Sequence, residues 1–257
     1  MSDMRFTEEE IKNGYLRTHS TDDWPIERKI VDTASDKIKL ACTQLNETEY
    51  QKKKIVNYWC EFLKDNPTNY KKIHMVTRMN QQLFNAICHQ KELDYLFIKW
   101  LVADSIEQIQ ELRKLQFLYL DIPPKITCLN DLAKLKKLRS LYLINSSSVK
   151  TFSFLGEMRG LEELVIASRV YAGAKPSQKQ DLSFLKNLSE LKVLSLFDLR
   201  LETFSLDVFE HCVSIENIQI RNLRYKENGK WKTFLRKDME LLLERLPNVR
   251  YHNLDRF

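Results

Sequence analysis

The sequence is poor in the residues that break or cross-link a chain. It has five glycines, six prolines and five cysteines in 257 residues, so linker-like and low-complexity stretches are absent. The cysteines never form a C-x-x-C pair, which favours free thiols in a reducing compartment. No run reaches the roughly 18 apolar residues of a membrane span, and the N-terminal stretch lacks the apolar core of a secretory signal. We therefore expect a cytoplasmic protein with no membrane partner.

Motifs for catalysis or cofactor binding are also missing. The sequence has no phosphate loop, dinucleotide fingerprint or H-E-x-x-H motif, and its histidines and cysteines lack metal-ligand spacing. Cys88–His89 and His211–Cys212 are sequence neighbours, but neighbouring residues on a helix point apart, so they indicate no nucleophile and base. We expect no enzymatic activity, no cofactor, no metal and no small-molecule substrate.

A repeat occupies most of the chain. The pattern L-x-x-L-x-L, with substitutions, starts at residues 70, 93, 115, 138, 161, 191 and 215, and a weak copy starts at 249. Apolar residues also recur three, six and nine positions before each start, which predicts a short helical or 3₁₀ segment behind each strand. One strand and its return segment cannot bury an apolar face alone, so stacked copies should form one continuous core.

The repeat resembles the leucine-rich repeat family, in its short, internalin-like class of about 22 residues. Residues 181–201, DLSFLKNLSELKVLSLFDLRL, match best. The resemblance implies an α/β solenoid with a parallel sheet on its concave face, in seven to eight copies over residues 70–257. The family's Asn or Cys, three residues after the last strand Leu, is replaced. Those positions hold Leu101, Pro123, Ser146, Arg169, Leu199 and Leu223.

Residues 1–69 lie outside the repeat and are expected to form an N-terminal helical cap. Thr7 and Glu10 have the spacing of a capping box that opens a short helix. Ile55, Trp59 and Leu63 follow helical spacing, and Asn66-Pro67 should end that helix. Solenoids need such caps to cover the exposed core of the first repeat.

An aromatic patch is predicted on the face of the strands opposite the return segments. In the resemblance, the third, fifth and seventh residues of each copy point to that face. Neighbouring strands lie about 4.8 Å apart, so rings on adjacent copies should touch. The patch comprises Tyr95, Phe97, Phe117, Tyr119 and Tyr142, with Lys99, Asp121 and Phe197 in the seventh column.

These rings could also serve the fold alone, in either of two ways. Aromatic residues have high β-propensity and pack across strands, and the N-terminal cap could fold over them. Later copies carry Glu, Ser, Asn and Gln in the same columns, so the strand does not require aromatic residues. We therefore expect the patch to be a protein-binding surface.

Two insertions, near residues 168–180 and 221–237, interrupt the repeat at the same edge. In the second, Asn228-Gly229 predicts a type I′ hairpin that pairs Glu227 with Lys230, Lys226 with Trp231 and Tyr225 with Lys232. Seven Lys or Arg and one Glu give residues 221–237 a net charge of +6, which equals that of the whole chain. The positive charge is therefore local.

The hairpin has three candidate roles. Its cations and aromatic rings could bind an acidic protein face, or they could grip phosphates and stack bases of a nucleic acid. Its charges could instead only protect an exposed edge from aggregation. No nucleic-acid motif accompanies the hairpin, so we favour a protein partner or no partner over nucleic acid. Its candidate contact residues are Arg221, Arg224, Tyr225, Lys226, Lys230, Trp231 and Lys232.

The sequence thus predicts a non-enzymatic module that recognises another protein. The expected contacts are the concave aromatic patch and the insertions. The alternative is an adaptor that binds nucleic acid or another anionic surface through the basic hairpin.

Overall fold

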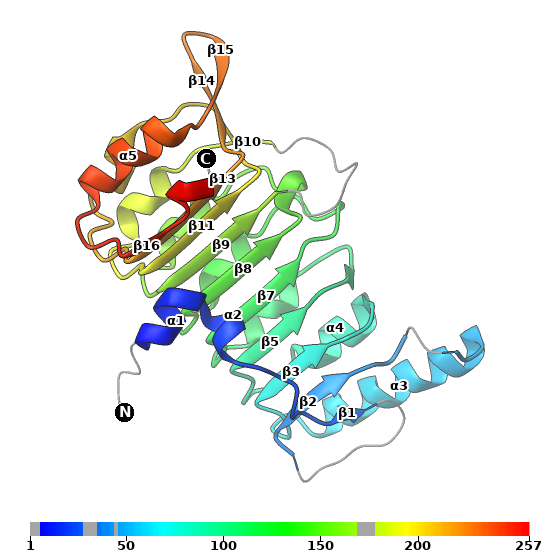
Figure 1. Cartoon of the computed structure of the whole chain (residues 1–257). Helices are drawn as coiled ribbons and strands as arrows, with labels where there is room; N and C mark the ends of the chain where they lie inside the picture. The colour runs from blue at the N-terminus through cyan, green and yellow to red at the C-terminus, as the bar shows by residue number, and fades with distance from the viewer. Residues whose placement is uncertain (1–5, 28–34, 44–45, 169–177, 257) are drawn as a thin grey trace. The chain divides into compact units, whose positions relative to one another are not determined.

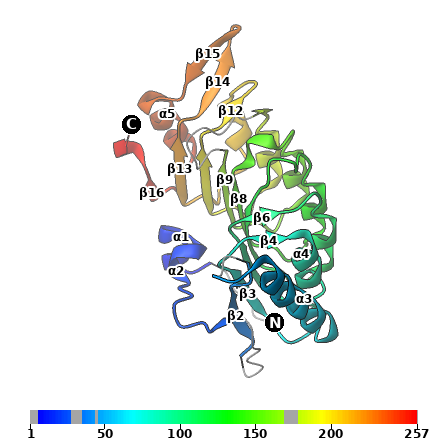
Figure 2. The same cartoon turned by 90° about the vertical axis from the view of Figure 1, so that its right-hand side faces the viewer.

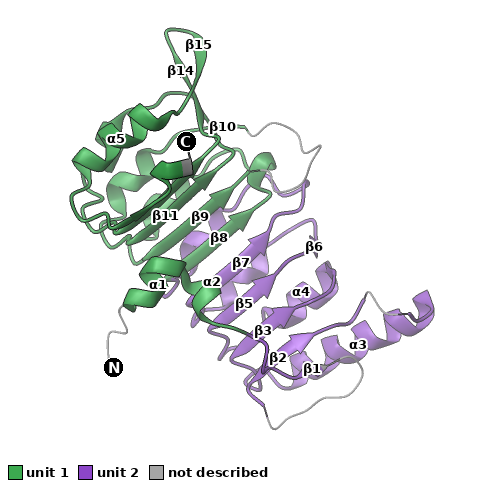
Figure 3. Ribbon diagram, viewed as in Figure 1, with its two compact units in different colours: residues 1–20, 139–257 green, residues 21–138 purple. Residues whose placement is uncertain are grey.

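The structure is a computed structural model that describes residues 6–27, 35–43, 46–168 and 178–256 (Figure 1). The chain divides into two compact units (Figure 3). Unit 1 consists of residues 1–20 and 139–257, and unit 2 consists of residues 21–138. The segment expected to be one N-terminal cap is therefore shared between the units. Most of the first predicted insertion, residues 169–177, lies outside the described residues.

Unit 2 contains a parallel sheet built from the first copies of the repeat and from two strands that precede the repeat, within residues 1–69. Ile73, Leu96 and Leu118 are aligned across three neighbouring strands, as the repeat predicts. In spatial order the strands are β1 (Ile26–Glu27), β2 (Lys37–Leu40), β3 (Lys72–Met75), β5 (Tyr95–Ile98) and β7 (Phe117–Asp121).

Helical return segments cover one side of these strands (Figure 2). The longest begins at a capping box on Thr48, buries Trp59 and Leu63, and ends before Asn66, so the predicted helix is confirmed. The segments are α3 (Glu49–Asp65), α4 (Gln81–Ile87), η1 (Glu107–Glu111) and η2 (Asn130–Lys134). A small parallel pair of strands, β4 (Met79–Asn80) and β6 (Leu101–Val102), lies beside them.

Unit 1 repeats this architecture with tighter turns, mostly 3₁₀, between strands, which confirms the predicted return segments. Its parallel strands, in spatial order, are β8 (Ser140–Ile144), β9 (Glu163–Ala167), β11 (Val193–Phe197), β13 (Asn217–Arg221) and β16 (Tyr251–His252). The turns and helices of its repeats are η3 (Ser146–Ser148), η4 (Ser153–Glu157), η5 (Ser183–Asn187), η6 (Leu206–Phe209), α5 (Arg236–Arg245) and η7 (Leu254–Arg256).

A second, small sheet of unit 1 follows the ends of its strands. Its order is β10 (Lys179–Gln180), β12 (Arg200–Leu201), β14 (Arg224–Glu227) and β15 (Lys230–Thr233). The last two strands form the predicted hairpin in the predicted register. Asn228 and Gly229 have φ values of 50° and 76°, as a type I′ turn requires.

The family's missing asparagine ladder has a local substitute in unit 1. Asn145, Asp198 and Asn222, each two residues after the last strand apolar residue, adopt positive φ, which Asn and Asp tolerate better than most residues. The Asn222 amide also donates to the Asp198 carboxylate at 3.0 Å. The next position is apolar and buried at Leu199 and Leu223. The polar turn residue therefore lies one position earlier than in the family pattern.

The repeated apolar columns form the core of each unit. The first, fourth and sixth residues of the copies are almost all fully buried, for example Leu93, Leu96 and Ile98. Burying one such side chain contributes roughly 1.5 to 3 kcal/mol of transfer free energy. No helix in the described part of the chain is both long enough and apolar enough to cross a membrane.

The first helices of the chain lie on the opposite face of unit 1's sheet from its return segments (Figures 1 and 2). They are α1 (Glu8–Asn13) and α2 (Tyr15–Thr18). The capping box predicted at the start of α1 is present, because the Thr7 hydroxyl accepts from Glu10 N–H and the Glu10 carboxylate accepts from Thr7 N–H. We call residues 6–19 the N-terminal segment and the face that it covers the inner face of unit 1.

Candidate functional site

The aromatic residues of unit 2 form two stacked columns on its inner face. In the fifth column, the ring of Phe97 stacks between His74 and Tyr119, with centroid distances of 4.0 and 4.1 Å. In the third column, Tyr95 stacks on Phe117 at 4.5 Å. The predicted contact between rings of neighbouring copies is therefore present. Aromatic pairs contribute about 0.5 to 1.5 kcal/mol each beyond area burial.

The predicted exposure of these rings is wrong for three of them. Tyr95 is 1% exposed, Phe97 8% and Phe117 0%. Trp24 packs edge-on against the Tyr95 ring, with a centroid distance of 5.1 Å and an interplanar angle of 71°. The segment that carries Trp24 thus folds over the third column, which was one of the two alternatives open from the sequence. Asp121 is buried as well.

The fifth column remains partly accessible. Tyr119 and His74 are half-buried, and Lys99, at the end of the neighbouring strand, is exposed with its ammonium over the Trp100 ring. Burial, helped by the positive charges of the nearby Lys39 and Lys99, lowers the pKa of His74 to about 4. His74 is therefore neutral at physiological pH and acts as a flat aromatic member of the column.

The inner face of unit 1 is covered by the N-terminal segment. Phe6 and Ile11 are buried against Val193, and Tyr15 and Tyr251 pack against this cluster. The Asn217 side chain donates from β13 to the carbonyl oxygens of Ile11 at 2.8 Å and of residue 12 at 3.0 Å. The strands therefore hold this segment through both apolar and main-chain contacts.

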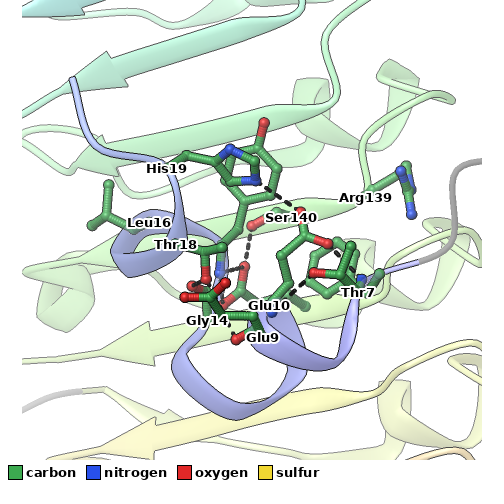
Figure 4. A network of polar contacts seen from close by, with 12 residues as sticks. Thr7, Glu9, Glu10, Gly14, Leu16, Thr18, His19, Arg139 and Ser140 are labelled. Atoms are coloured by element: carbon green, nitrogen blue, oxygen red, sulfur yellow. Dashed lines mark hydrogen bonds and ion pairs between the residues drawn. The ribbon is translucent and has the colours of Figure 1, made fainter. Parts of the chain in front are cut away.

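A buried carboxylate lies at the centre of this contact. Glu163 is 0% exposed and accepts hydrogen bonds from the Tyr142 hydroxyl at 2.6 Å, from Tyr15 N–H at 3.2 Å and from the Ser140 hydroxyl. Burial raises the pKa of Glu163 to about 7, although these hydrogen bonds act to lower it. Figure 4 shows Gly14 of the segment close to Ser140 of β8 in this network.

Gly14 is required at this place for two reasons. Its φ of +80° is one that side chains rarely adopt, and a Cβ there would lie 2.7 Å from Glu163 Oε1 and 3.0 Å from the Tyr142 hydroxyl. A glycine therefore lets the backbone approach the carboxylate. Within the segment, Glu10 is also paired with His19, with 2.8 Å between Oε1 and Nε2 (Figure 4).

Charged residues line the edge of unit 1 where its strands begin. Glu162 is paired with Arg139 and with Lys192, and it also accepts from Phe6 N–H at 3.2 Å. Arg250 forms a two-pronged pair with Glu8 of the segment, with both N–O distances at 2.8 Å. The two charged clusters thus bind the first residues of the N-terminal segment.

The hairpin of unit 1 carries a half-buried Trp231 surrounded by cations. The guanidinium of Arg200 lies 4.3 Å from the ring centroid, and Arg224 and Lys226 lie 5.8 Å from it. Cation–π contacts of this kind contribute about 0.5 to 1 kcal/mol each at exposed sites. Lys230, Lys232 and Arg224 are exposed.

Tyr225 is more buried than predicted, and two lysines of the hairpin lie beside acids. Tyr225 is 8% exposed because its ring packs against Phe204 at 5.2 Å, so it belongs to the core beneath the hairpin. Lys226 lies 4.0 Å from Glu202, and Lys232 is paired with Glu227. The local positive charge is thus partly neutralised by acids, one of which lies outside the hairpin.

The remaining candidate residues lie in unit 1 but away from an aromatic patch. Phe197 is half-buried beneath the Arg221 guanidinium, which lies 5.1 Å from its ring and 3.8 Å from Asp198. Tyr142 belongs to the Glu163 network. Among the described residues, no three His, Cys, Asp or Glu side chains lie close enough together to hold a metal ion.

Sequence reasoning missed Glu163, Asn217, Gly14 and Trp24. The only signal for Glu163 was a carboxylate in the third column beside Ser140, where two earlier copies carry rings. Gly14 was one of only five glycines, and it lies four residues after Glu10 of the predicted capping box. Trp24 lies outside the repeat and gave no signal of its own.

Comparison with known proteins supports the fold. No family model and no curated protein matches the chain. An internalin of Listeria monocytogenes has 18% sequence identity and a TM-score of 0.53, over 72% of this chain and 54% of that one. Internalin C2 of the same species has 15% identity and a TM-score of 0.47, over 72% and 68%. A leucine-rich repeat protein of Leptospira interrogans has 12% identity and a TM-score of 0.43, over 86% and 66%.

The chain spans about half the length of the first internalin. Identity at this level carries the fold and not the partner or the activity. The repeating strands, the return segments and this similarity together show that the chain has the leucine-rich repeat fold of the internalins.

Proposed function

We propose that the chain is a recognition module that binds another protein without catalysis, with the hairpin of unit 1 as its main contact. The observation that carries the proposal is Trp231, which is held at the surface by Arg200, Arg224 and Lys226. Trp and Arg are, with Tyr, the residue types enriched among the residues that dominate binding energy at protein interfaces. The β12–β14 pairing anchors the hairpin, so little entropy is lost when it binds.

The partner surface should be acidic and partly apolar. Arg224 and Lys230 are exposed cations beside an aromatic ring, and such a surface complements carboxylates that surround an apolar contact. The fifth column of unit 2, with half-buried Tyr119 and exposed Lys99, is proposed as a second contact. All five cysteines are free thiols, which supports our proposal that the protein works in a reducing compartment such as the cytoplasm.

The test is affinity purification from the native host with the intact chain, followed by binding of the purified partner. The bait variants are Trp231→Ala with Arg224→Ala, and Arg245→Ala as a control on α5 away from the hairpin. We expect the hairpin variant to lose the partner and to weaken the purified complex at least about tenfold, as an interface anchor would. Equal retention by the hairpin variant and the wild type would refute the hairpin as the contact.

The runner-up is binding of a nucleic acid or another polyanion through the same hairpin. The exposed side chains Arg224, Lys230 and Lys232 favour it. The acids beside Lys226 and Lys232 disfavour it, because fewer free cations remain to neutralise phosphates. A single-stranded oligonucleotide should then show a steep loss of affinity between about 50 and 200 mM salt. Absence of binding at low salt would remove this candidate.

A further inference from the structure

The N-terminal segment is bound to unit 1 in the way that a separate peptide would be bound. It contributes residues 6–19, whereas the rest of unit 1 begins at Arg139. It adds no strand to the sheet; instead, side chains that project from the strands contact it. The inner face therefore acts as a surface and the segment as its occupant.

The contacts to the main chain of the segment are spaced along its length. Glu162 accepts from Phe6 N–H, Asn217 donates to two carbonyl oxygens at the end of α1, and Glu163 accepts from Tyr15 N–H. These bonds recognise a backbone path and not a particular sequence. Any segment with the same path can make them.

The side chains of the segment add selectivity. Phe6 and Ile11, five residues apart, insert against Val193, and the Arg139 guanidinium lies 5.3 Å from the Phe6 ring centroid. Glu8 receives hydrogen bonds from both Arg250 and the Tyr251 hydroxyl. The surface thus selects an acidic segment with an aromatic and an aliphatic anchor.

Two polar groups that hold the segment can be hydrated when it leaves. Glu163 and Asn217 are polar and are covered by the segment, so water can hydrate them once they are uncovered. The strands beneath them retain their leucine columns, which are buried on the opposite face of the sheet. An uncovered inner face is therefore compatible with a folded unit 1.

We propose that the inner face of unit 1 is a peptide-binding site and that residues 6–19 occupy it as an intramolecular ligand. The segment that replaces them comes from a partner protein and shares their chemistry. It is acidic, has an aromatic and an aliphatic anchor five residues apart, and continues into a glycine whose backbone lies against Glu163. This site is separate from the hairpin, so the two proposals fail or stand independently.

A tethered occupant sets a quantitative expectation. The effective concentration of a segment carried on the same chain as its site is taken as on the order of millimolar. Suppose that the separate peptide binds the uncovered site with a Kd on the order of 10 μM. The apparent affinity of the intact chain for added peptide should then be about 100-fold weaker than that of the uncovered site. The intact chain should therefore bind the free peptide poorly, and release of the segment should reveal the site.

The test uses the full chain and a fluorescent synthetic peptide of residues 6–19. The variant Gly14→Ala in the chain should release the segment, because its Cβ would collide with Glu163 Oε1. We expect this variant to bind the wild-type peptide at least about tenfold more tightly than the wild-type chain does. The same peptide carrying Gly14→Ala is the matched control and should not bind. Equal binding by the two chains overturns the proposal.

A second variant covers the case in which Gly14→Ala does not fold. A protease site inserted after Ser20 allows the folded chain to be cut between its segment and the start of unit 2. The cut protein should stay folded and exchange its own segment for the labelled peptide. Loss of the folded state after cutting, or failure to exchange under excess peptide, would show that the segment is a structural part of unit 1.

Discussion

The carboxylate of Glu163 accepts a hydrogen bond from the backbone N–H of Tyr15 at 3.2 Å, although 148 residues separate the two in sequence. Tyr142 and Ser140 also donate to it, Glu10 raises its pKa by repulsion, and Arg17 lies near Tyr142. Burial dominates and raises the pKa of Glu163 from 4.5 to about 7. The contact between segment and strands is therefore sensitive to pH near neutrality.

Replacing this carboxyl with an amide should remove that sensitivity. A group whose pKa is raised on burial contributes stability that is fully present below pH 4.5 and is lost as the pH rises through about 7. Glu163→Gln keeps an acceptor for Tyr15 N–H and cannot ionise. The free energy of unfolding of Glu163→Gln should exceed that of the wild type by an amount that grows between pH 4.5 and 7, reaches on the order of 3 kcal/mol, and then levels off. Urea unfolding at several pH values measures it, and a pH-independent difference would contradict the prediction.

Trp24 is predicted to stabilise unit 2 by covering Tyr95. Trp24→Ala should lower the free energy of unfolding by about 3 kcal/mol, as is usual when a large buried aromatic side chain is truncated. Trp24→Phe keeps an aromatic ring over Tyr95 and should lose much less. Denaturant unfolding of both variants and of the wild type tests this. If the two variants and the wild type have equal free energies of unfolding, Trp24 does not cover the column.

Two tyrosines on the same face of unit 2 should respond differently to truncation. Tyr95 is buried and Tyr119 is half-buried, although both were expected to contact a partner. Tyr95→Ala should lower the thermal midpoint, and Tyr119→Ala should instead weaken the partner complex by about 1 kcal/mol with little change in midpoint. Calorimetry and titration with the purified partner separate the two effects. If Tyr119→Ala leaves binding unchanged, the fifth column is not a contact.

The bridging role of Glu162 should be visible in a double-mutant cycle. Its side chain is 13% exposed and lies between Arg139 and Lys192. Glu162→Gln leaves two cations without their shared anion and should reduce stability by about 1 to 2 kcal/mol. Adding Lys192→Met should recover part of the loss. The exposed pair of Asp104 and Lys125 is the control, and Asp104→Asn should leave the unfolding midpoint unchanged.

Cysteine reactivity should distinguish one thiol from the other four. Cys128 is exposed, whereas burial raises the pKa of Cys60 to about 11 and that of Cys212 to about 12, and it raises the pKa of Cys42 and Cys88 as well. A thiol reagent reacts with the thiolate, so one rapid modification per folded chain is expected. Cys128→Ser should abolish it. More than one rapid modification would indicate that a return segment opens.

The elements that the sequence predicted are those with a local signal. The leucine columns repeat in register, so the burial of residues such as Leu96 follows from neighbouring copies alone. The hairpin register follows from Asn228-Gly229, because a two-residue turn fixes every pair that follows it.

The features that it did not predict depend on contacts between distant segments. Tyr95 occupies a column that faces outward in the repeat, and the docking of Trp24 on its ring was not visible in the repeat. Glu163 has an ordinary position on its strand, and its burial comes from a segment that precedes the whole repeat. Neither contact has a periodic pattern from which it could be inferred.

The charged edge of unit 1 bears on how a repeat array can evolve. Arg139, Glu162, Lys192, Glu216 and Arg250 occupy the second position of successive copies, so the sign alternates from strand to strand. Removing or duplicating one copy by recombination would place like charges side by side, whereas removing two neighbouring copies would preserve the alternation. The alternating charges therefore disfavour the gain or loss of an odd number of copies. They also oppose pairing of these strands in the wrong order during folding.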